Sequence, residues 1–138
     1  MKKRGWSAFI KKSYQKMKML GIGLDKVNVV RFHSREPLKH RMAKLVVCHH
    51  LFDIGHFFKT EQKIRESFCD VIDLNTFTIY EIEAYATKRI EKKKLEQFYH
   101  PLIEDIVIIN LMKMDFEWYE MVKFSDEIKK RIRIDGLT

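Results

Sequence analysis

The chain has 138 residues, of which 46% are hydrophobic and 33% charged. This length suits one domain and excludes a two-domain enzyme, and the apolar content excludes disorder of the chain as a whole. Lysine and arginine number 27 against 19 acidic residues, and the resulting net charge of +8 favours a polyanionic partner. Nucleic acid is the first candidate, and an anionic membrane surface is the second.

Cysteine use and hydropathy bear on the compartment. Cys48 and Cys69 form no CxxC pair, which excludes a zinc knuckle or a disulfide framework and favours a reducing environment. No stretch approaches the ~20 apolar residues of a membrane span. Lysines interrupt the apolar positions near the N-terminus, so a signal peptide is not expected. We therefore expect a soluble cytoplasmic protein without stable membrane insertion.

Residues 1–24 predict a basic amphipathic helix with an aromatic stripe that includes Trp6, Phe9 and Tyr14. Its basic residues are Lys2, Lys3, Arg4, Lys11, Lys12, Lys16 and Lys18. Two interpretations are equally favoured. The helix contacts a phosphate backbone or a membrane surface through its lysines, or it packs its aromatic stripe on the core and leaves the lysines solvated.

The rest of the chain alternates between strand and helix patterns. We expect a strand over Lys26–Phe32, and a helix over Pro37–Phe52 with Ser34 as its cap. Further expected elements are a strand over His56–Ile64, a hairpin of Asp70–Leu74 and Phe77–Ala84 with its turn at Asn75-Thr76, a helix over Lys88–Tyr99, a strand over Asp105–Asn110 and a helical tail from about Phe116. The core order is therefore helix, three strands, helix and strand, which indicates an α/β fold.

Acidic residues inside apolar strands are the most informative feature. Alternation along Phe77–Ala84 places Glu81 and Glu83 on one face, and the hairpin places Asp70 opposite them. Carboxylates that face one another in a sheet repel, so they usually hold a cation or a positive side chain between them. Mg²⁺ prefers oxygen ligands of this kind.

The first core helix adds three polar residues to this cluster. Glu36, His40 and Lys44 follow an i, i+4, i+8 spacing that stacks them on one face, and Glu61 joins from the next strand. Taken singly, each residue is better explained without a function than as part of a site. It would be a solvated charge, a half-buried histidine, or a carboxylate in a salt bridge to Lys88 or Arg89. Their recurrence on three consecutive elements favours a functional site.

These residues resemble the PD-(D/E)xK nuclease superfamily, especially small archaeal and archaeal-virus members similar to Holliday junction resolvases. The resemblance covers about residues 36–110 and rests on Glu36, on Asp70 in CDVIDL and on Glu81 and Glu83 in YEIE. It implies a restriction-endonuclease-like core, with a mixed central sheet flanked by helices. It also implies Mg²⁺ or Mn²⁺ as the cofactor and DNA as the partner. If the protein is viral, its compartment is the host cytoplasm.

The resemblance implies a role for each matched residue. Asp70 is the metal-binding aspartate, Glu81 the second acid and Glu36 the helix acid, while Glu83 stands where the family has its catalytic lysine. Lys88 or Lys44 then supplies the ammonium, or Glu83 binds a second metal. The expected catalytic residues are Glu36, Asp70, Glu81, Glu83 and Lys88, with Asp70, Glu81 and Glu36 as metal ligands, His40, Lys44 and Glu61 in support, and the basic residues of 1–24 on DNA.

The sequence therefore predicts a basic helix over residues 1–24 and a single nuclease-like domain over 25–138, with a C-terminal helical extension over 111–138. The expected function is that of a metal-dependent DNA endonuclease selective for DNA structure, and a homodimer suits a two-fold substrate. Two alternatives stay open. One is a DNA-binding protein of the same fold without catalysis, and the other is a basic protein that binds a membrane or a partner.

Overall fold

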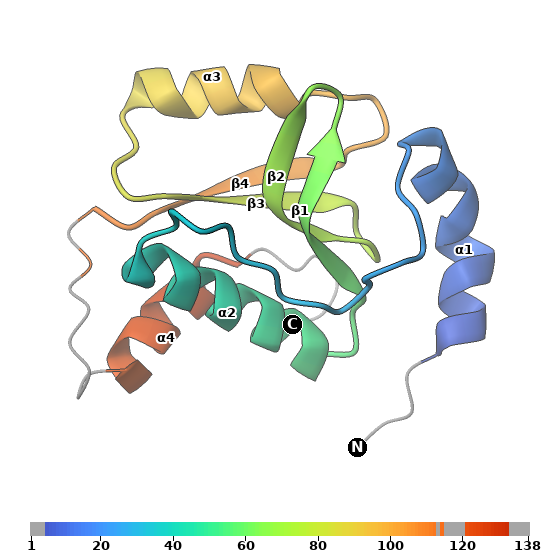
Figure 1. Cartoon of the computed structure of the whole chain (residues 1–138), viewed down its shortest axis with the longest axis horizontal. Coiled ribbons are helices and arrows are strands. Elements are labelled where there is room, and N and C mark those ends of the chain that lie inside the picture. The colour runs from blue at the N-terminus through green and yellow to red at the C-terminus, as the bar shows by residue number, and fades with distance from the viewer. Residues whose placement is uncertain (1–4, 113, 115–120, 133–138) are drawn as a thin grey trace.

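The computed structural model describes residues 5–112, 114 and 121–132 and has an α/β architecture (Figure 1). Within these residues a four-stranded mixed sheet has the strand order β1-β2-β3-β4. The elements are α1 (Trp6–Met19), α2 (Leu38–Asp53), β1 (Phe58–Ile64), β2 (Ser67–Asp73), β3 (Thr78–Glu83), α3 (Lys88–Phe98), β4 (Asp105–Asn110) and α4 (Met121–Lys130). From α2 to β4 the elements follow the predicted order of helix, three strands, helix and strand.

The sheet consists of an antiparallel meander and one parallel strand. β1 pairs with β2 and β2 pairs with β3, both antiparallel, whereas β3 and β4 are parallel. Parallel neighbours need a crossover connection, and α3 provides it. In the parallel register Glu83 lies beside Asn110. The ends of β3 and β4 therefore meet at one end of the sheet.

Alternate residues of the central strands point to opposite faces, so each face of the sheet has its own apolar cluster. Tyr80 and Ile82 of β3 are buried in the cluster that includes residues of α2 and α4. Ile79 is buried in the other cluster, together with Phe98 of α3 and Met17 of α1. Figure 1 shows the resulting layers, with α2 and α4 on one side of the sheet and α3 on the other.

The N-terminal helix packs on the sheet domain. Phe9 and Met17 of α1 are buried, and the centroid of the Phe9 ring lies 4.4 Å from that of Phe57. The opposite face carries the exposed side chains of Lys11, Lys12 and Lys18. The interpretation that the apolar stripe packs on the core is therefore confirmed for Phe9 and Met17. The expected DNA-binding residues Lys2, Lys3 and Arg4 lie outside the described residues.

The predicted strand over Lys26–Phe32 is wrong, because this segment is irregular chain beside β1. Lys26 and Asn28 have φ angles of 57° and 63°, in the left-handed region that interrupts a strand. The segment still bonds to β1. The Asn28 amide donates to the Phe58 carbonyl at 2.8 Å, and the Asn28 side-chain oxygen accepts from the Phe58 amide at 3.0 Å.

Two predicted boundaries also differ. Pro37, and not Ser34, is the N-cap of α2, and no side-chain hydrogen bond caps this helix. The second hairpin turn is longer than predicted, because Asp73 pairs with Thr78 and Phe77 lies in the turn with a φ of 57°. The Asp73 carboxylate accepts from the Asn75 amide at 2.9 Å, which stabilises the turn. The predicted helical tail is confirmed for α4, whereas residues 115–120 lie outside the described residues.

Candidate functional site

The predicted acidic residues meet where β2 separates from β3. Val71 and Tyr80 are the last paired residues of this ladder. Beyond them, the Asp70 amide donates to Glu81 Oε2 at 2.6 Å, and the Ile82 amide donates to Asp70 Oδ2 at 2.7 Å. Carboxylates thus replace the main-chain acceptors that continued pairing would supply. These bonds fix both acids at the opening between the strands.

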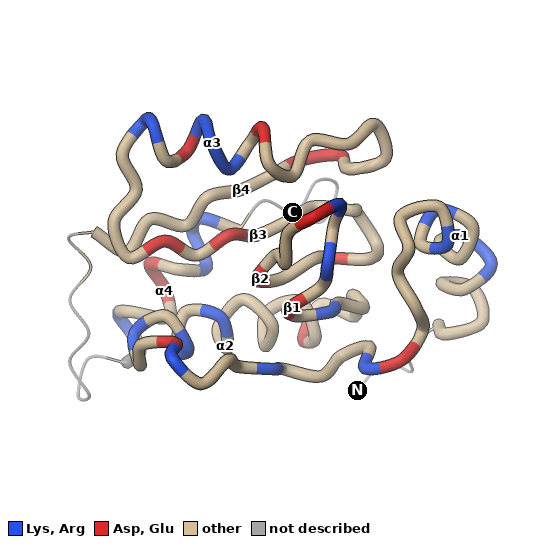
Figure 2. The backbone as a smooth tube through the Cα atoms, turned by 45° about the horizontal axis from the view of Figure 1, so that its top comes forward, with Lys and Arg blue, Asp and Glu red and all other residues tan. Residues whose placement is uncertain are grey.

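The opening is a cavity of about 350 Å³ with a charged wall. Its acidic residues come from three strands: Glu61 of β1, Asp70 of β2, and Glu81 and Glu83 of β3. The positive groups on the wall are Lys39 and His40 of α2 and Lys94 of α3. Figure 2 shows the acidic positions of β3 between α3 and α2. The cavity therefore combines several carboxylates with cations from both helical layers.

His40 joins α2 to both acidic strands. Its Nδ1 donates to Glu36, and its Nε2 donates to the Ile82 carbonyl at 2.9 Å and lies 3.5 Å from Asp70 Oδ2. A carbonyl and a carboxylate only accept hydrogen bonds, so both ring nitrogens carry protons. Burial lowers the pKa of His40, but Asp70 and Glu36 outweigh it and the pKa lies above its usual value. His40 is therefore an imidazolium.

Lys44 is a buried cation behind the cavity. Its side chain is fully buried, and its Nζ lies 2.9 Å from Glu36 Oε1 and 2.6 Å from Glu61 Oε1. The same ammonium donates to the Arg31 carbonyl at 3.0 Å. Burial lowers the pKa of Lys44, but the two carboxylates reverse this effect and raise the pKa above its usual value. Lys44 therefore joins the loop before α2, α2 itself and β1.

Glu36 anchors these cations. It is only 2% exposed, and both of its oxygens accept hydrogen bonds from Lys44, His40 and the His33 amide. These contacts occupy most of the acceptor capacity of a carboxylate. The sequence correctly predicted that Glu36, His40 and Lys44 meet. The geometry gives Glu36 a positioning role, in contrast to the metal-ligand role that the resemblance implies.

Lys94 is a site residue that the sequence did not predict, as is Lys39 on the same wall. The Lys94 Nζ lies 3.1 Å from Glu81 Oε1 and 3.3 Å from Glu83 Oε1. It stands four residues after Ile90 and four before the buried Phe98, on the helix face that meets the sheet. A lysine within such a stripe is the signal that could have identified it. Lys88, the expected source of the ammonium, is exposed at the first position of α3 and does not line the cavity.

Asp70 and Glu81 have opposite pKa shifts. Burial alone would raise the pKa of Asp70, but the bonds from His40 and the Ile82 amide lower it below its usual value. Burial and the Asp70 charge raise the pKa of Glu81 to about 8, against a smaller opposing effect of Lys94. At neutral pH Asp70 is therefore ionised, and Glu81 is mostly protonated. A divalent cation that displaces this proton would relieve the repulsion between them.

Two groups of potential metal ligands lie close together within the described chain. The ligand atoms of His33, Glu36 and Glu61, and those of Glu36, His40 and Asp70, lie within 4.8 Å of one another. In the first group the Lys44 ammonium already bridges the two glutamates. In the second group His40 donates both of its ring protons. Both groups are therefore occupied by the protein's own cations.

The carboxylates on the cavity wall are a further set of oxygen donors, although Asp70, Glu81 and Glu83 do not form a group of ligand atoms within 4.8 Å of one another in the described chain. Asp70, Glu81 and Glu83 line the cavity from neighbouring strands. Carboxylate oxygens are the ligands that Mg²⁺ and Mn²⁺ prefer. Asp70 Oδ2 and Glu81 Oε2 bond to main-chain amides, which holds the carboxylates in place. The chemistry of these donors suits the cofactor that the resemblance implies, whereas Lys94 and the Asp70 amide occupy both oxygens of Glu81 in this arrangement.

The lysines of α1 lie away from this cavity. Lys16 Nζ lies 3.0 Å from Glu104 and 4.5 Å from the centroid of the Phe77 ring. Phe77 precedes β3 and Glu104 precedes β4, whereas Glu83 ends β3 about 20 Å further along the strand. Figure 2 shows the basic positions of α1 at this far end. Lys11, Lys12, Lys16 and Lys18 therefore do not line the acidic cavity.

Comparisons with protein-family models, with curated proteins and with solved structures find no match to this chain. None of the described helices is long and apolar enough to cross a membrane. The features that bear on function are therefore those of the cavity itself. Its distinctive features are two amide-bound carboxylates with opposite pKa shifts and a lysine from α3 beside them.

Proposed function

We propose that the protein is a metal-dependent DNA endonuclease that hydrolyses phosphodiester bonds. The observation that carries this proposal is the meeting of Asp70, Glu81, Glu83 and Lys94 on the wall of one cavity. This cavity lies in an arrangement of helix, three strands, helix and strand, which is the order that the resemblance to PD-(D/E)xK nucleases implies. The net charge of +8 supports a polyanionic substrate.

Asp70 and Glu81 would hold the metal ion, with Glu83 beside them. When bound, Mg²⁺ or Mn²⁺ supplies a Lewis acid that lowers the pKa of water and offsets charge on the phosphate. Asp70 is ionised at neutral pH and presents a charged oxygen to the cavity. Glu81 must first lose the proton that burial and the Asp70 charge retain. Proton loss from Glu81 therefore accompanies metal binding.

Lys94 takes the place of the lysine that the superfamily carries at the position of Glu83. Its ammonium lies 3.3 Å from Glu83 Oε1, so the positive charge reaches the same region from α3 instead of β3. The side chain is held by two carboxylates, which keeps it in place before the substrate arrives. A positioned ammonium stabilises the negative charge that develops on a phosphate during hydrolysis.

His40, Lys44 and Glu36 are positioning residues in this proposal. His40 helps to keep Asp70 ionised through its charge, and its bond to the Ile82 carbonyl fixes α2 against β3. Lys44 and Glu36 support His40 from behind the cavity. Exchange of His40 or Lys44 for a neutral residue should therefore change the pH dependence of cleavage, because Asp70 would lose part of the positive charge that lowers its pKa.

A cleavage assay on purified protein tests this function. Supercoiled plasmid, linear duplex and four-way-junction DNA are incubated with Mg²⁺, Mn²⁺ or EDTA. We expect metal-dependent cleavage that falls by at least ~100-fold in Asp70→Asn, Glu81→Gln and Lys94→Ala. Lys92→Ala is the matched control, because Lys92 is exposed on the same helix and does not line the cavity. Its activity should equal that of the wild type.

The same assay separates the alternatives. Salt-sensitive DNA binding without cleavage under any metal condition would overturn the nuclease and favour a DNA-binding protein without catalysis. No DNA affinity at low salt would remove both functions. Cleavage that persists in Asp70→Asn would place the reaction outside this cavity. Circular dichroism of each variant checks that a loss of activity is not a loss of fold.

A further inference from the structure

An exposed aromatic side chain stands at the mouth of the acidic cavity. Phe68 of β2 is 61% exposed, although it lines the cavity. It precedes Asp70 by two residues, and both side chains line the same wall, about 7 Å apart along the strand. Its cross-strand partner is Lys63, whose side chain is also exposed. An apolar ring is thus presented to solvent beside a carboxylate and a lysine.

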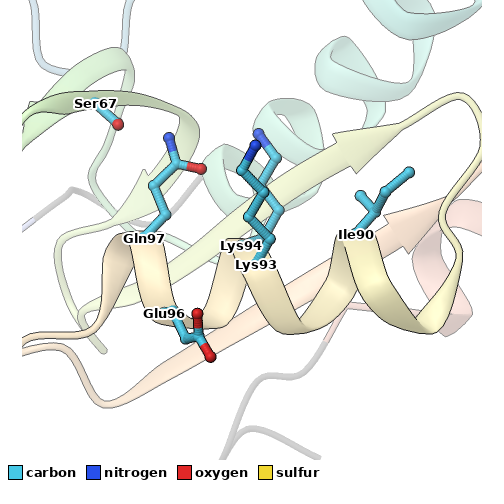
Figure 3. A pocket seen from close by; sticks show the side chains of 6 residues that line it. All are labelled: Ser67, Ile90, Lys93, Lys94, Glu96 and Gln97. Carbon is cyan, nitrogen blue, oxygen red and sulfur yellow. The ribbon is translucent and has the colours of Figure 1, made fainter.

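A second hollow shares Lys94 with the acidic cavity. It has a volume of about 680 Å³, and its wall includes Ser67, Lys93, Lys94 and Gln97. Figure 3 shows Lys93, Lys94 and Gln97 extending from α3 on the side where Ser67 lies. Lys94 lines both hollows, and Ser67 directly precedes Phe68 in β2. The two hollows therefore adjoin at Lys94, with Ser67 lining one of them and Phe68 the other.

The groups along this groove match the chemistry of one nucleic-acid strand. Lys93 and Lys94 offer ammonium groups to phosphates, and Ser67 and Gln97 offer hydrogen bonds. Phe68 offers a flat ring on which a base can stack. Within a duplex the neighbouring bases cover both faces of each base, so away from the duplex ends a ring can stack only on an unpaired base. Aromatic and basic side chains in one groove are the pattern of single-strand binding.

We infer that this groove binds a single DNA strand, with an unpaired base stacked on Phe68 and adjacent phosphates on Lys93 and Lys94. The substrate class is then DNA with unpaired nucleotides beside the cleaved phosphate, such as single strands, flaps and splayed forks. The inference rests on the proposed nuclease site for the identity of its ligand. In this proposal Phe68 determines the preference for unpaired DNA and takes no part in the hydrolysis.

Equilibrium binding in EDTA tests this inference without cleavage. The probes are a short single strand, a blunt duplex of the same sequence and a splayed fork, each with 2-aminopurine as a stacking reporter. We expect Phe68→Ala to lower the affinity for the single strand and the fork at least ~10-fold, and Phe68→Trp to restore it. Duplex affinity should change less than about twofold, because phosphate contacts remain. The wild type and Phe68→Trp should quench the reporter, and Phe68→Ala should not.

Leu95→Ala is the matched control. Leu95 is a 45% exposed apolar residue of α3 that lines neither hollow, so its truncation should leave all three affinities unchanged. Equal affinities of the wild type and Phe68→Ala would overturn the inference. An equal loss on duplex and single strand, or a wild type that does not bind the single strand, would do the same. Because Phe68 is largely exposed, we expect Phe68→Ala to keep the thermal stability of the fold.

The two proposals fail in different ways. If the Phe68-dependent preference for unpaired DNA is found without any metal-dependent cleavage, the groove is supported and the nuclease is overturned. If cleavage depends on metal and on Asp70 while Phe68→Ala binds and cuts every substrate like the wild type, the nuclease is supported and the stacking role is overturned. Binding and cleavage measured on the same three DNAs therefore separate them.

Discussion

Lys44 gives the sharpest test of how the site is held together. Its fully buried ammonium contacts Glu36 and Glu61 and donates to the Arg31 carbonyl. Lys44→Met keeps the aliphatic stem and removes the charge. Glu36, which is only 2% exposed, then keeps only His40 and the His33 amide as partners. Glu61 also loses its contact with the ammonium. The structure therefore predicts a large loss of stability from a change that preserves most of the packing volume.

The size of this loss follows from the burial of the remaining charge. Breaking a buried ion pair by removal of one partner costs about 3–5 kcal/mol, and the lower end applies here because His40 still contacts Glu36. Lys59→Met is the matched control, because Lys59 is also buried but contacts the Gly23 carbonyl and Asp25, whose side chain is 73% exposed. Its removal leaves no charge buried. The expected cost is about 1 kcal/mol, the net contribution of an ordinary hydrogen bond.

Urea unfolding followed by circular dichroism measures both losses. The pKa of Lys44 is raised, so its contribution is complete below the usual lysine pKa and is lost only when the pH rises through the folded value. The measurement at neutral pH therefore reports the full effect. Glu36→Gln should recover part of the loss in the Lys44→Met background, because a neutral amide needs no cation. Equal losses for the two lysine variants, or no recovery by Glu36→Gln, would refute this account.

Two further outcomes follow from the charges. Because the pKa of Glu81 is raised to about 8, the folded chain holds a proton that the unfolded chain releases above its usual value of 4.5. The free energy of unfolding should therefore fall between about pH 5 and pH 8. Glu81→Gln should flatten this pH dependence and raise the free energy of unfolding near pH 8 by about 1–3 kcal/mol. Thermal unfolding across this pH range measures both effects, and an unchanged slope in Glu81→Gln would contradict the assignment of the slope to Glu81. Lys93→Ala should lower the slope of log affinity against log salt concentration by about 1, which corresponds to the loss of one phosphate contact. Lys12→Ala should lower this slope by less, because α1 lies away from the cavity. Fluorescence anisotropy at several salt concentrations compares them, and equal changes would contradict this placement.

Local patterns predicted the part of the site that depends on a single helix or hairpin. The i, i+4 spacing of His40 and Lys44 is a property of helical geometry, so their shared face could be predicted from the sequence, whereas Glu36 precedes the N-cap Pro37 and meets them from the chain before α2. The pairing of β2 with β3 similarly brought Asp70 to Glu81. These predictions succeeded because few residues separate the partners and the spacing has one geometric meaning.

The remaining features depend on tertiary packing. The sequence could not place Lys94 because the face of α3 that meets the sheet depends on the crossover from β3 to β4. The β-branched residues near Val29 favour a strand, but the left-handed conformations of Lys26 and Asn28 interrupt it. Lys16 contacts Glu104 at the end of the sheet far from Glu83, and its predicted contact with DNA stays a prediction. Each of these outcomes involves partners that are distant in sequence.

Direct binding of Mn²⁺ tests the central claim that Asp70 and its neighbours form a metal site. Isothermal titration calorimetry near pH 8, where about half of the Glu81 side chains are ionised, should detect Mn²⁺ binding by the wild type. Asp53→Asn is the matched control, because Asp53 is exposed at the end of α2 and away from the cavity wall. We expect Asp70→Asn to weaken binding at least ~10-fold and Asp53→Asn to leave it unchanged. A wild type that binds no Mn²⁺, or an Asp70→Asn variant that binds it equally well, would contradict the account.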